Sequence, residues 1–210
     1  MTNKYESFNL EIEDNIANII LSRPEQLNSM SRKFWVELPE ILEEVNRNSE
    51  IRVLIISSTG KHFCAGMDLS AFDNGVANIP KEKRPDNARI GEALYRSARE
   101  LQEYISKLEK IRVPVIAAIH GGCIGGAVDL VTACDIRLAT TDAFFCIQEI
   151  NIGMAADVGT LQRLPRIIPD SKMRELAYTG RRMLADEAKE SGLVSEVYNS
   201  HEEMMNACLL

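Results

Sequence analysis

Two short, almost wholly apolar runs constrain the fold of this chain most. They are VLIISS at 53–58 and VPVIAAI at 113–119, and the segment between them, ARIGEALYRSARELQEYISKLEKI, has helical spacing. Runs of this kind are typical of strands that are covered on both faces. A strand, a helix and a second strand at this spacing predict a βαβ unit with a right-handed crossover, and therefore an α/β fold.

Other patterns predict the elements around this unit. The segment FNLEIEDNIANIILSRP alternates around Asp14-Asn15, which indicates a hairpin. Residues 31–46 have helical spacing, and Pro39 is expected to kink or break that helix. The polar, Pro-containing stretch 73–87 predicts a loop. Further on we expect strands in CDIRLAT and AFFCIQEI, helices at 157–166, 171–178 and 184–191, and a last strand at 193–198.

Length and composition limit the class of protein. A chain of 210 residues predicts one domain, and its 45% apolar and 26% charged residues are ordinary for a globular protein. The net charge of −7 argues against a nucleic-acid partner or an anionic membrane surface. The five cysteines form no C-x-x-C pair, so we expect a reduced intracellular compartment.

The sequence also predicts a soluble protein without a targeting segment at its start. The first residues, MTNKYESFNLEIED, lack the apolar core of a signal peptide and the Arg-rich pattern of a transit peptide. The stretch 115–134 has the length of a membrane helix, but it contains four glycines, His120 and Asp129. We therefore expect no membrane span there, but a buried strand, a turn and the start of a buried helix.

Two glycine-containing turns are the first candidates for a functional site. Lys61-His-Phe-Cys-Ala-Gly-Met-Asp-Leu69 and His120-Gly-Gly-Cys-Ile-Gly-Gly-Ala-Val-Asp129 each follow a buried strand. Glycine lets a ligand approach the backbone, and the start of a helix offers free N–H donors. Adjacent in a sheet, the two turns could form an oxyanion hole; otherwise they are only tight turns. No Gly-Lys-Ser/Thr follows the Gly125-Gly126 pair, so this pair is not a phosphate loop, and its spacing does not match the dinucleotide-binding pattern.

Three carboxylates in apolar surroundings are the second candidates. Asp129 lies in GGAVDLV, Glu149 in FFCIQEI and Asp157 in GMAADVG. Burial would raise the pKa of such a group, which suits proton transfer near neutral pH. The alternative is that each lies on the surface, and Asp157 could simply cap a helix that starts at Val158.

Histidines and cysteines are weaker candidates. His62 and His120 have no partner at a spacing typical of metal ligands, so we expect no metal site. Cys64 has no base nearby in the sequence and is interpreted as a packing residue.

Three motifs bring a resemblance to a known family. KHFCAGMDL, IAAIHGGCIGGAVDLVTACDIRLAT and EINIGMAADVGTLQRLPRII resemble the enoyl-CoA hydratase/isomerase (crotonase) superfamily, and within it the Δ3,5-Δ2,4-dienoyl-CoA isomerases. The resemblance implies a crotonase-like ββα spiral core over 1–199 and an extended acyl-CoA thioester as substrate, with no separate cofactor. It also implies a homotrimer or a dimer of trimers in the mitochondrial matrix or the peroxisome.

The same resemblance implies roles for individual residues. The N–H groups of Met67 and Gly126 would form the oxyanion hole. The CoA-thioester site would be lined by Ala65, Gly66, Met67, Asp68 and Leu69. Hydratases of the family carry a glutamate at the position of Asp129 and add water with a glutamate pair, so the aspartate here favours isomerisation. Glu149 would remove a proton from C2, Asp157 would return one at C6, and Asp129 would position or tune Glu149.

The last residues predict the start of a further helix. Ser200-His-Glu-Glu203 is a capping box, and Met204, Ala207 and Cys208 begin an apolar face. Family members usually continue with helices that cover the acyl pocket, so we expect 200–210 to be the start of a truncated C-terminal helical region. Two alternatives to the isomerase stay open: an enoyl-CoA hydratase, and a non-catalytic subunit that assembles with a full-length relative.

Overall fold

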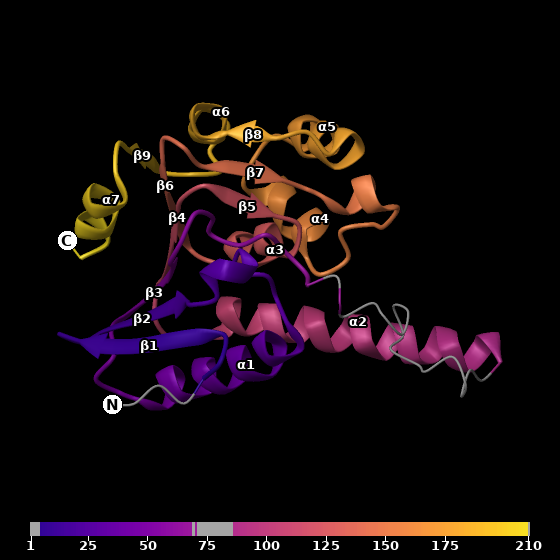
Figure 1. Cartoon of the computed structure of the whole chain (residues 1–210), viewed down its shortest axis with the longest axis horizontal. Coiled ribbons are helices and arrows are strands. Elements are labelled where there is room, and N and C mark those ends of the chain that lie inside the picture. Colours follow the sequence, from indigo (N-terminus) through magenta and orange to yellow (C-terminus); the bar gives the residue numbers. More distant parts are fainter. Residues whose placement is uncertain (1–4, 69, 71–85, 210) are drawn as a thin grey trace.

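The computed structural model describes residues 5–68, 70 and 86–209, and it has a mixed α/β architecture (Figure 1). The strands are β1 (Phe8–Glu13), β2 (Ile16–Leu21), β3 (Val53–Ser58), β4 (Val115–Ile119), β5 (Gly122–Ile124), β6 (Ile136–Thr140), β7 (Phe144–Cys146), β8 (Met183–Leu184) and β9 (Glu196–Tyr198). The helices are α1 (Arg32–Arg47), α2 (Asn87–Lys110), α3 (Gly126–Thr132), α4 (Thr160–Arg163), α5 (Asp170–Thr179), α6 (Ala185–Glu190) and α7 (His201–Cys208). Short 3₁₀ helices are η1 (Pro24–Gln26), η4 (Glu149–Ile152) and η5 (Leu164–Arg166).

The predicted hairpin is confirmed. β1 and β2 pair antiparallel, with Glu13 opposite Ile16. The two residues between them, Asp14 and Asn15, have φ angles of 48° and 67°. A two-residue type I′ turn requires positive φ at both positions, and Asn and Asp adopt that conformation more readily than most residues.

The predicted βαβ unit is also confirmed as a parallel arrangement. The main sheet has the order β1-β2-β3-β4-β6-β9, and every pair from β2 onward is parallel. Helix α2 lies between β3 and β4 in the chain. Because β3 and β4 are parallel neighbours, their carboxyl ends lie at the same edge of the sheet. The loops that leave this edge carry the two glycine turns, and a second sheet, β5-β7-β8, follows.

The main sheet is covered on both faces at β3 and β4, which explains why these two strands are almost wholly apolar. Alternate residues of a strand point to opposite faces of the sheet. In β3, Leu54 and Ile56 belong to the main core, which includes the apolar side of α1. Ile55 lies on the other face, in a cluster with Met204 and Cys208 of α7.

Helix α1 continues through Pro39, so the predicted break does not occur. Ser31 caps the helix, since its hydroxyl accepts a hydrogen bond from the Phe34 N–H at 3.3 Å. A proline inside a helix costs about 3 kcal/mol. Full burial of one large apolar side chain contributes about 1.5–3 kcal/mol. The stripe buried along this helix outweighs the lost bond: Phe34, Trp35, Leu38, Ile41, Leu42 and Val45.

Downstream of β6 the predicted strands are shorter than expected, whereas α5 and α6 agree with the helices predicted at 171–178 and 184–191. Strand β7 covers only the first part of AFFCIQEI, and the 3₁₀ helix η4 follows it. The short α4 begins at Thr160 instead of Val158, and β9 occupies only the end of LVSEVY. Most of the predicted loop at 73–87 lies outside the described residues. At its end, the Asp86 carboxylate accepts hydrogen bonds from Ala88 and Arg89 N–H and caps α2.

Helix α7 packs on the outer face of the main sheet (Figure 1). The predicted cap forms, since the Ser200 hydroxyl accepts a hydrogen bond from the Glu203 N–H at 3.1 Å. The return bond differs by one residue, because the Glu203 carboxylate accepts from Asn199 N–H at 3.2 Å and not from Ser200.

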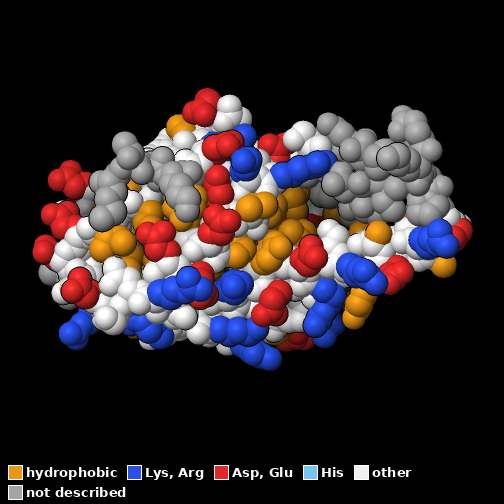
Figure 2. All heavy atoms as spheres, turned by 90° about the horizontal axis from the view of Figure 1, so that it is seen from below, with side chains coloured by type: hydrophobic (Ala, Val, Ile, Leu, Met, Phe, Trp, Pro, Cys, Tyr) orange, Lys and Arg blue, Asp and Glu red, His pale blue; other side chains and the backbone are white. Residues whose placement is uncertain are grey.

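The surface in the view of Figure 2 carries charged side chains of both signs. Hydrophobic side chains gather near the middle of this face, between Lys, Arg, Asp and Glu side chains. Among the helices of the described ranges, none is long and apolar enough to cross a membrane.

Asn28 joins the segment after β2 to the loop that leaves β3. This 3% exposed side chain donates to Thr59 O at 2.7 Å and to His62 O at 3.0 Å, and accepts from Arg23 N–H at 2.9 Å. We expect Asn28→Ala to lower the free energy of unfolding by about 2–4 kcal/mol, because buried groups lose their partners. Urea unfolding measures this loss.

The control for this prediction is Gln26→Ala, an exposed residue of the same segment. Its free energy of unfolding should stay within about 0.5 kcal/mol of the wild type. Equal stability of the Asn28 and Gln26 variants would contradict the role assigned to Asn28.

Candidate active site

The loops that leave β3 and β4 pair with each other beyond the sheet. Phe63 N–H donates to His120 O at 2.8 Å, and Cys64 N–H donates to Gly122 O at 3.0 Å. In the other direction, Ile124 N–H donates to Cys64 O at 3.1 Å. The two glycine turns are therefore joined side by side, as an oxyanion hole built from both would require.

Gly66 allows these loops to approach closely. A Cβ atom at this position would lie only 2.6 Å from Ile124 O and 3.5 Å from Gly126 N. Its φ angle is +86°, in the region that side chains disfavour. Any other residue at position 66 would therefore push the two loops apart.

The close approach brings two unpaired N–H donors, those of Met67 and Gly126, to one pocket. A Cβ atom at Gly126 would lie 4.0 Å from Met67 N. Met30 fixes the backbone on both sides of Met67, because its N–H donates to Gly66 O at 2.8 Å and its carbonyl accepts from Asp68 N–H at 3.1 Å. Within the described residues, neither the Met67 nor the Gly126 N–H has an acceptor. Both donors are thus available to a ligand oxygen.

Asp129 lies in α3 and is 1% exposed. Its Oδ1 accepts a hydrogen bond from the Thr160 N–H at 2.6 Å, whereas Oδ2 is buried without a partner among the described residues. Burial raises the pKa of Asp129 to about 7, and the neighbouring Glu149 raises it further, while the Thr160 hydrogen bond and Arg163 oppose the rise. The carboxyl group can therefore hold a proton near neutral pH.

Glu149 lies at the start of η4, and not in a strand as predicted. Its Oε2 is also buried without a partner within the described part of the chain. Its Oε1 lies 3.3 Å from the place of a Cβ atom on Gly125, so the glycine leaves room for the carboxylate. Burial raises the pKa of Glu149, and the charge of Asp157 raises it further.

Asp157 precedes α4 and does not cap it, because the N-cap residue is Gly159. The alternative that Asp157 caps a helix starting at Val158 is therefore wrong, but Asp157 is exposed, as the alternative of a surface position predicted. Its side chain lines the same pocket as Glu149, and its carbonyl accepts a hydrogen bond from Gln102 Nε2 of α2 at 2.7 Å. The two carboxylates thus reach the pocket from different elements.

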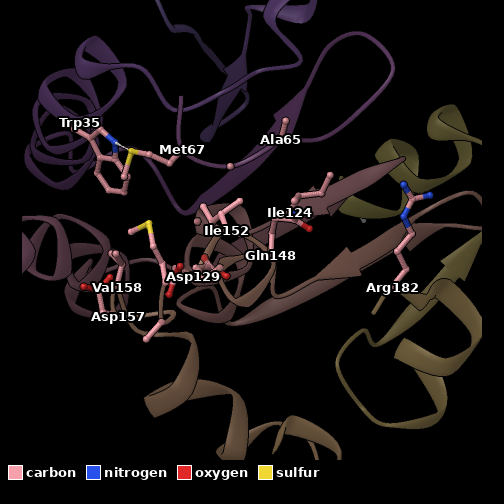
Figure 3. Close-up of a pocket in the computed structure, with 16 residues that line it drawn as sticks. Trp35, Ala65, Met67, Ile124, Asp129, Gln148, Ile152, Asp157, Val158 and Arg182 are labelled. Carbon is pink, nitrogen blue, oxygen red and sulfur yellow. Dashed lines mark hydrogen bonds between the residues drawn. The ribbon is translucent and has the colours of Figure 1, made fainter. Parts of the chain in front are cut away.

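One pocket of about 380 Å³ collects most of the predicted site, a volume within the usual range of about 300–1,000 Å³ for small-molecule sites. The predicted residues that line it are Ala65, Gly66, Met67, Gly126, Asp129, Glu149 and Asp157. Figure 3 shows Met67 and Trp35 on one side of the space, Asp129 and Asp157 on another, and Arg182 at its far end.

Of the predicted thioester site, Asp68 does not line this pocket, and Leu69 is not among the described residues. The Asp68 carboxylate accepts hydrogen bonds from the Ser70 N–H at 3.0 Å and from its hydroxyl at 2.7 Å. These bonds and the more distant Arg23 guanidinium lower the pKa of Asp68.

Trp35 is a pocket residue that sequence reasoning missed. Its indole N–H donates to Met67 Sδ at 3.3 Å and holds that side chain beside the oxyanion donor (Figure 3). The helical stripe in which it lies predicts core packing, and nothing in the pattern separates it from Phe34. The other lining residues outside the prediction are Ile124, Gly125, Gln148, Ile152, Met154, Ala155, Val158 and Arg182. Of these, only Gly125 carried a signal, as part of the glycine doublet.

His62 and His120 contact backbone groups, and Cys64 is buried in the core. His62 Nδ1 accepts a hydrogen bond from Gly122 N–H at 2.9 Å, and His120 Nε2 lies 2.9 Å from Gly60 O. Burial raises the pKa of the Cys64 thiol to about 12, so the group stays protonated. Within the ranges that the structure describes, no group of three His, Cys, Asp or Glu side chains could hold a metal ion.

Together these groups define a site for proton transfer next to an oxyanion. Two N–H donors can hold an oxygen that gains negative charge, while carboxyl groups, among them Asp129 and Glu149 with raised pKa values, can exchange protons beside it. The chain belongs to the enoyl-CoA hydratase/isomerase family, whose model matches residues 11–210. The family resemblance of its sequence motifs is thereby confirmed.

Curated relatives are similar over most of this chain. The peroxisomal Δ(3,5)-Δ(2,4)-dienoyl-CoA isomerase of Arabidopsis thaliana is 44% identical over 92% of the chain and 69% of that protein. The mitochondrial Δ(3,5)-Δ(2,4)-dienoyl-CoA isomerase of Rattus norvegicus is 45% identical over 97% of the chain and 62% of that protein. The chain therefore spans 62–69% of the length of these two relatives.

Solved structures confirm the crotonase-like α/β fold. A probable enoyl-CoA hydratase/isomerase from Mycobacterium abscessus has a TM-score of 0.81 and 32% identity, over 97% of this chain and 73% of that chain. An enoyl-CoA hydratase from Bacillus anthracis has a TM-score of 0.81 and 31% identity, over 97% of this chain and 74% of that chain.

The raised pKa of Asp129 predicts a pH-dependent effect of Asp129→Asn on stability. The native carboxyl group titrates at about 7 and its ordinary pKa is 3.8. Between these values the folded state binds more protons, so the wild type loses stability as the pH rises towards 7. Asparagine keeps an oxygen for Thr160 N–H and does not ionise. Relative to that of the wild type, the free energy of unfolding of Asp129→Asn should therefore rise by on the order of 2 kcal/mol between pH 5 and pH 8.

Urea unfolding at the two pH values measures this gain. Asp186→Asn, at an exposed position of α6, controls for the removal of a charge. A stability difference between Asp129→Asn and wild type that is the same at both pH values would rule out a raised pKa at Asp129.

Proposed function

We propose that this chain isomerises 3,5-dienoyl-CoA thioesters to 2,4-dienoyl-CoA. The observation that carries the proposal is the pair of carboxylates, Glu149 and Asp157, that reach one pocket from separate elements beside two unpaired N–H groups. Moving two conjugated double bonds requires proton transfer at two distant carbons, C2 and C6. One carboxylate cannot easily reach both carbons, whereas two carboxylates from different parts of the chain can. The relatives of 44–45% identity, which are Δ(3,5)-Δ(2,4)-dienoyl-CoA isomerases, support the same activity.

In this proposal the thioester carbonyl oxygen lies between the Met67 and Gly126 N–H groups. The acyl-CoA would follow the loop of Ala65, Gly66, Met67, Asp68 and Leu69. CoA enters as part of the substrate, and the proposed steps use no further cofactor or metal, only the carboxylates and the backbone donors.

The reaction begins when Glu149 takes a proton from C2. The electron pair of that C–H bond forms a double bond between C1 and C2, and the carbonyl oxygen becomes an enolate stabilised by the two N–H donors. Asp157 then gives a proton to C6. The π pair of the C5–C6 double bond forms the new C6–H bond. The C3–C4 double bond moves to C4–C5, the C1–C2 double bond moves to C2–C3, and the carbonyl is restored. Glu149 has gained one proton and Asp157 has lost one, so exchange with solvent resets the pair.

Asp129 is proposed to tune Glu149. Two like charges close together disfavour each other, and this coupling is one of the causes that raise the pKa of Asp129. With its proton held, Asp129 leaves Glu149 as the anion next to the substrate. If Asp129 lost its proton, its negative charge would raise the pKa of Glu149. Glu149 would then be a stronger base but would be ionised in a smaller fraction of the molecules.

Two other functions remain alternatives. An enoyl-CoA hydratase would use the same oxyanion hole, but hydratases of the family carry a glutamate in place of Asp129. A non-catalytic subunit would join trimers of a full-length relative. Assembly into a trimer or a dimer of trimers, and residence in mitochondria or peroxisomes as in the named relatives, stay proposals for this chain.

The ultraviolet absorption of 3,5-octadienoyl-CoA tests the activity, because conjugation of the diene with the thioester changes it. We expect the purified chain to convert this substrate. Glu149→Gln and Asp157→Asn should each lower kcat about 10²–10⁴-fold, the usual contribution of a general acid or base. Both substitutions preserve side-chain size and remove the titrating group.

The matched control is Asp186→Asn, at an exposed position of α6 away from the pocket, which should keep wild-type turnover. Near-wild-type turnover in both site variants would contradict the assigned roles. Hydration of a simple 2-enoyl-CoA at a comparable rate would favour the hydratase. A folded protein without either activity would favour the non-catalytic subunit, and native mass measurement of a mixture with a full-length relative would detect mixed trimers.

A further inference from the structure

The short segment that carries Asp157 is anchored from two sides. On the pocket side, Thr160 N–H donates to Asp129 Oδ1 at 2.6 Å. On the opposite side the segment contacts α2, and Val158 lines both the pocket and a second hollow that includes Gln102, Ser106 and Arg163. Residues 157–159 thus separate the pocket from the second hollow, and this segment is called the wall below. An isolated wall of this kind would move unless its backbone groups were held.

Helix α2 holds the wall directly through the side chain of Gln102. Gln102 Nε2 donates to the carbonyl oxygen of Asp157 at 2.7 Å. The two residues are 55 positions apart in the sequence. Ser106 and Glu109 follow Gln102 at spacings of four and seven residues, so the three side chains lie on one face of the helix. In Figure 1, α4 lies beside this part of α2.

Arg163 supplies the second anchor and is itself held by α2. This 9% exposed residue donates from Nη1 to Val158 O at 3.2 Å. Its guanidinium also donates to Glu109 Oε2 at 2.8 Å and to Ser106 Oγ at 2.9 Å. Glu109 is exposed, but its carboxylate lies 2.7 Å from Arg163 Nη2 and forms an ion pair with the buried guanidinium. Consecutive carbonyl groups of Asp157 and Val158 therefore both have partners tied to α2.

Gly159 makes room for this arrangement. A Cβ atom at position 159 would lie 1.6 Å from Arg163 Nη1, so any side chain there would displace the guanidinium from its present position. The φ angle of Gly159 is +133°, also a conformation for glycine. The turn after Asp157 is thus shaped around the guanidinium.

We propose that Gln102 and Arg163 are positioning residues that hold Asp157 for the second proton transfer and form no hydrogen bond to Glu149. The proposal rests on the proposed isomerase function and adds a support for one of its two carboxylates. Glu149 lies on η4, whose backbone is closed by a separate bond from Met154 N–H to Glu149 O at 2.9 Å. Neither Gln102 nor Arg163 has a hydrogen bond to η4 in the described residues.

This separation has a chemical consequence. A displacement of about 1 Å can cost on the order of 100-fold in rate when it disturbs a proton-transfer geometry. Loosening the wall should slow proton delivery to C6, whereas proton removal at C2 by Glu149 should continue. A variant that is merely less stable would impair both steps together.

The test uses Gln102→Leu, which keeps the size of the side chain and removes the donor. The control is Gln162→Leu, the same substitution at an exposed position of α4. In D₂O, with 3,5-octadienoyl-CoA, deuterium entry at C2 reports Glu149, and formation of the 2,4-dienoyl product reports both steps. We expect Gln102→Leu to slow product formation about tenfold or more, with KM and C2 exchange within about twofold of wild type. Gln162→Leu should resemble wild type in all three.

Amide hydrogen exchange of residues 158–160 gives a readout that does not depend on activity. It should be faster in Gln102→Leu, and in Arg163→Lys as a second variant, than in wild type and Gln162→Leu. Unchanged amide exchange, unchanged product formation, or an equal fall in C2 exchange and product formation would each overturn the proposal. If wild type itself forms no 2,4-dienoyl product, the proposed function fails, and the amide exchange alone then decides whether these residues hold the wall.

Discussion

The pairing of the two loops beyond β3 and β4 is the interaction on which the site depends. Parallel strands bring their carboxyl ends to one edge, but a sheet edge alone does not align two N–H groups. The alignment comes from backbone bonds that continue past the strands, between Cys64 and both Gly122 and Ile124. Only glycine at position 66 permits the final approach, since a Cβ atom would lie 2.6 Å from Ile124 O. A backbone contact thereby sets the geometry that side chains later use.

The site also has a cost that the rest of the molecule must offset. Asp129 Oδ2 and Glu149 Oε2 are buried without a partner among the described residues. Leaving such groups unsatisfied costs about 1–3 kcal/mol each, and more when they are charged. Burial raises both pKa values, and at Asp129, where the pKa rises to about 7, a bound proton removes the charge that would otherwise be buried. The same response gives the carboxyl groups the protonation behaviour that proton transfer requires, and stability and chemistry are linked through one physical cause.

The sequence predicted the parts of this structure that follow from local pattern. The hairpin at Asp14-Asn15, the parallel apolar strands and the two glycine turns depend on residue type and spacing over a few positions. The predictions failed where tertiary packing decides. Pro39 stays inside α1 because the apolar stripe around it is buried. Glu149 lies outside β7, which ends at Cys146, and begins η4 instead. Trp35 could not be separated from the core stripe, since its contact with Met67 joins segments 32 residues apart.

The arrangement of the carboxylates shows why a local pattern could find the groups but not their supports. Asp129 lies on α3, Glu149 on η4 and Asp157 in front of α4, all within one stretch of the chain. Their clustering in the sequence is therefore visible. The supports come from elsewhere: Gln102 reaches Asp157 from α2, 55 residues away, and Gly125 leaves space for Glu149. Because each carboxylate is held by different neighbours, changes in one support can act on one proton transfer. An enzyme that moves protons at two carbons benefits from that independence, since the distance between its acid and its base can be adjusted without disturbing the oxyanion donors.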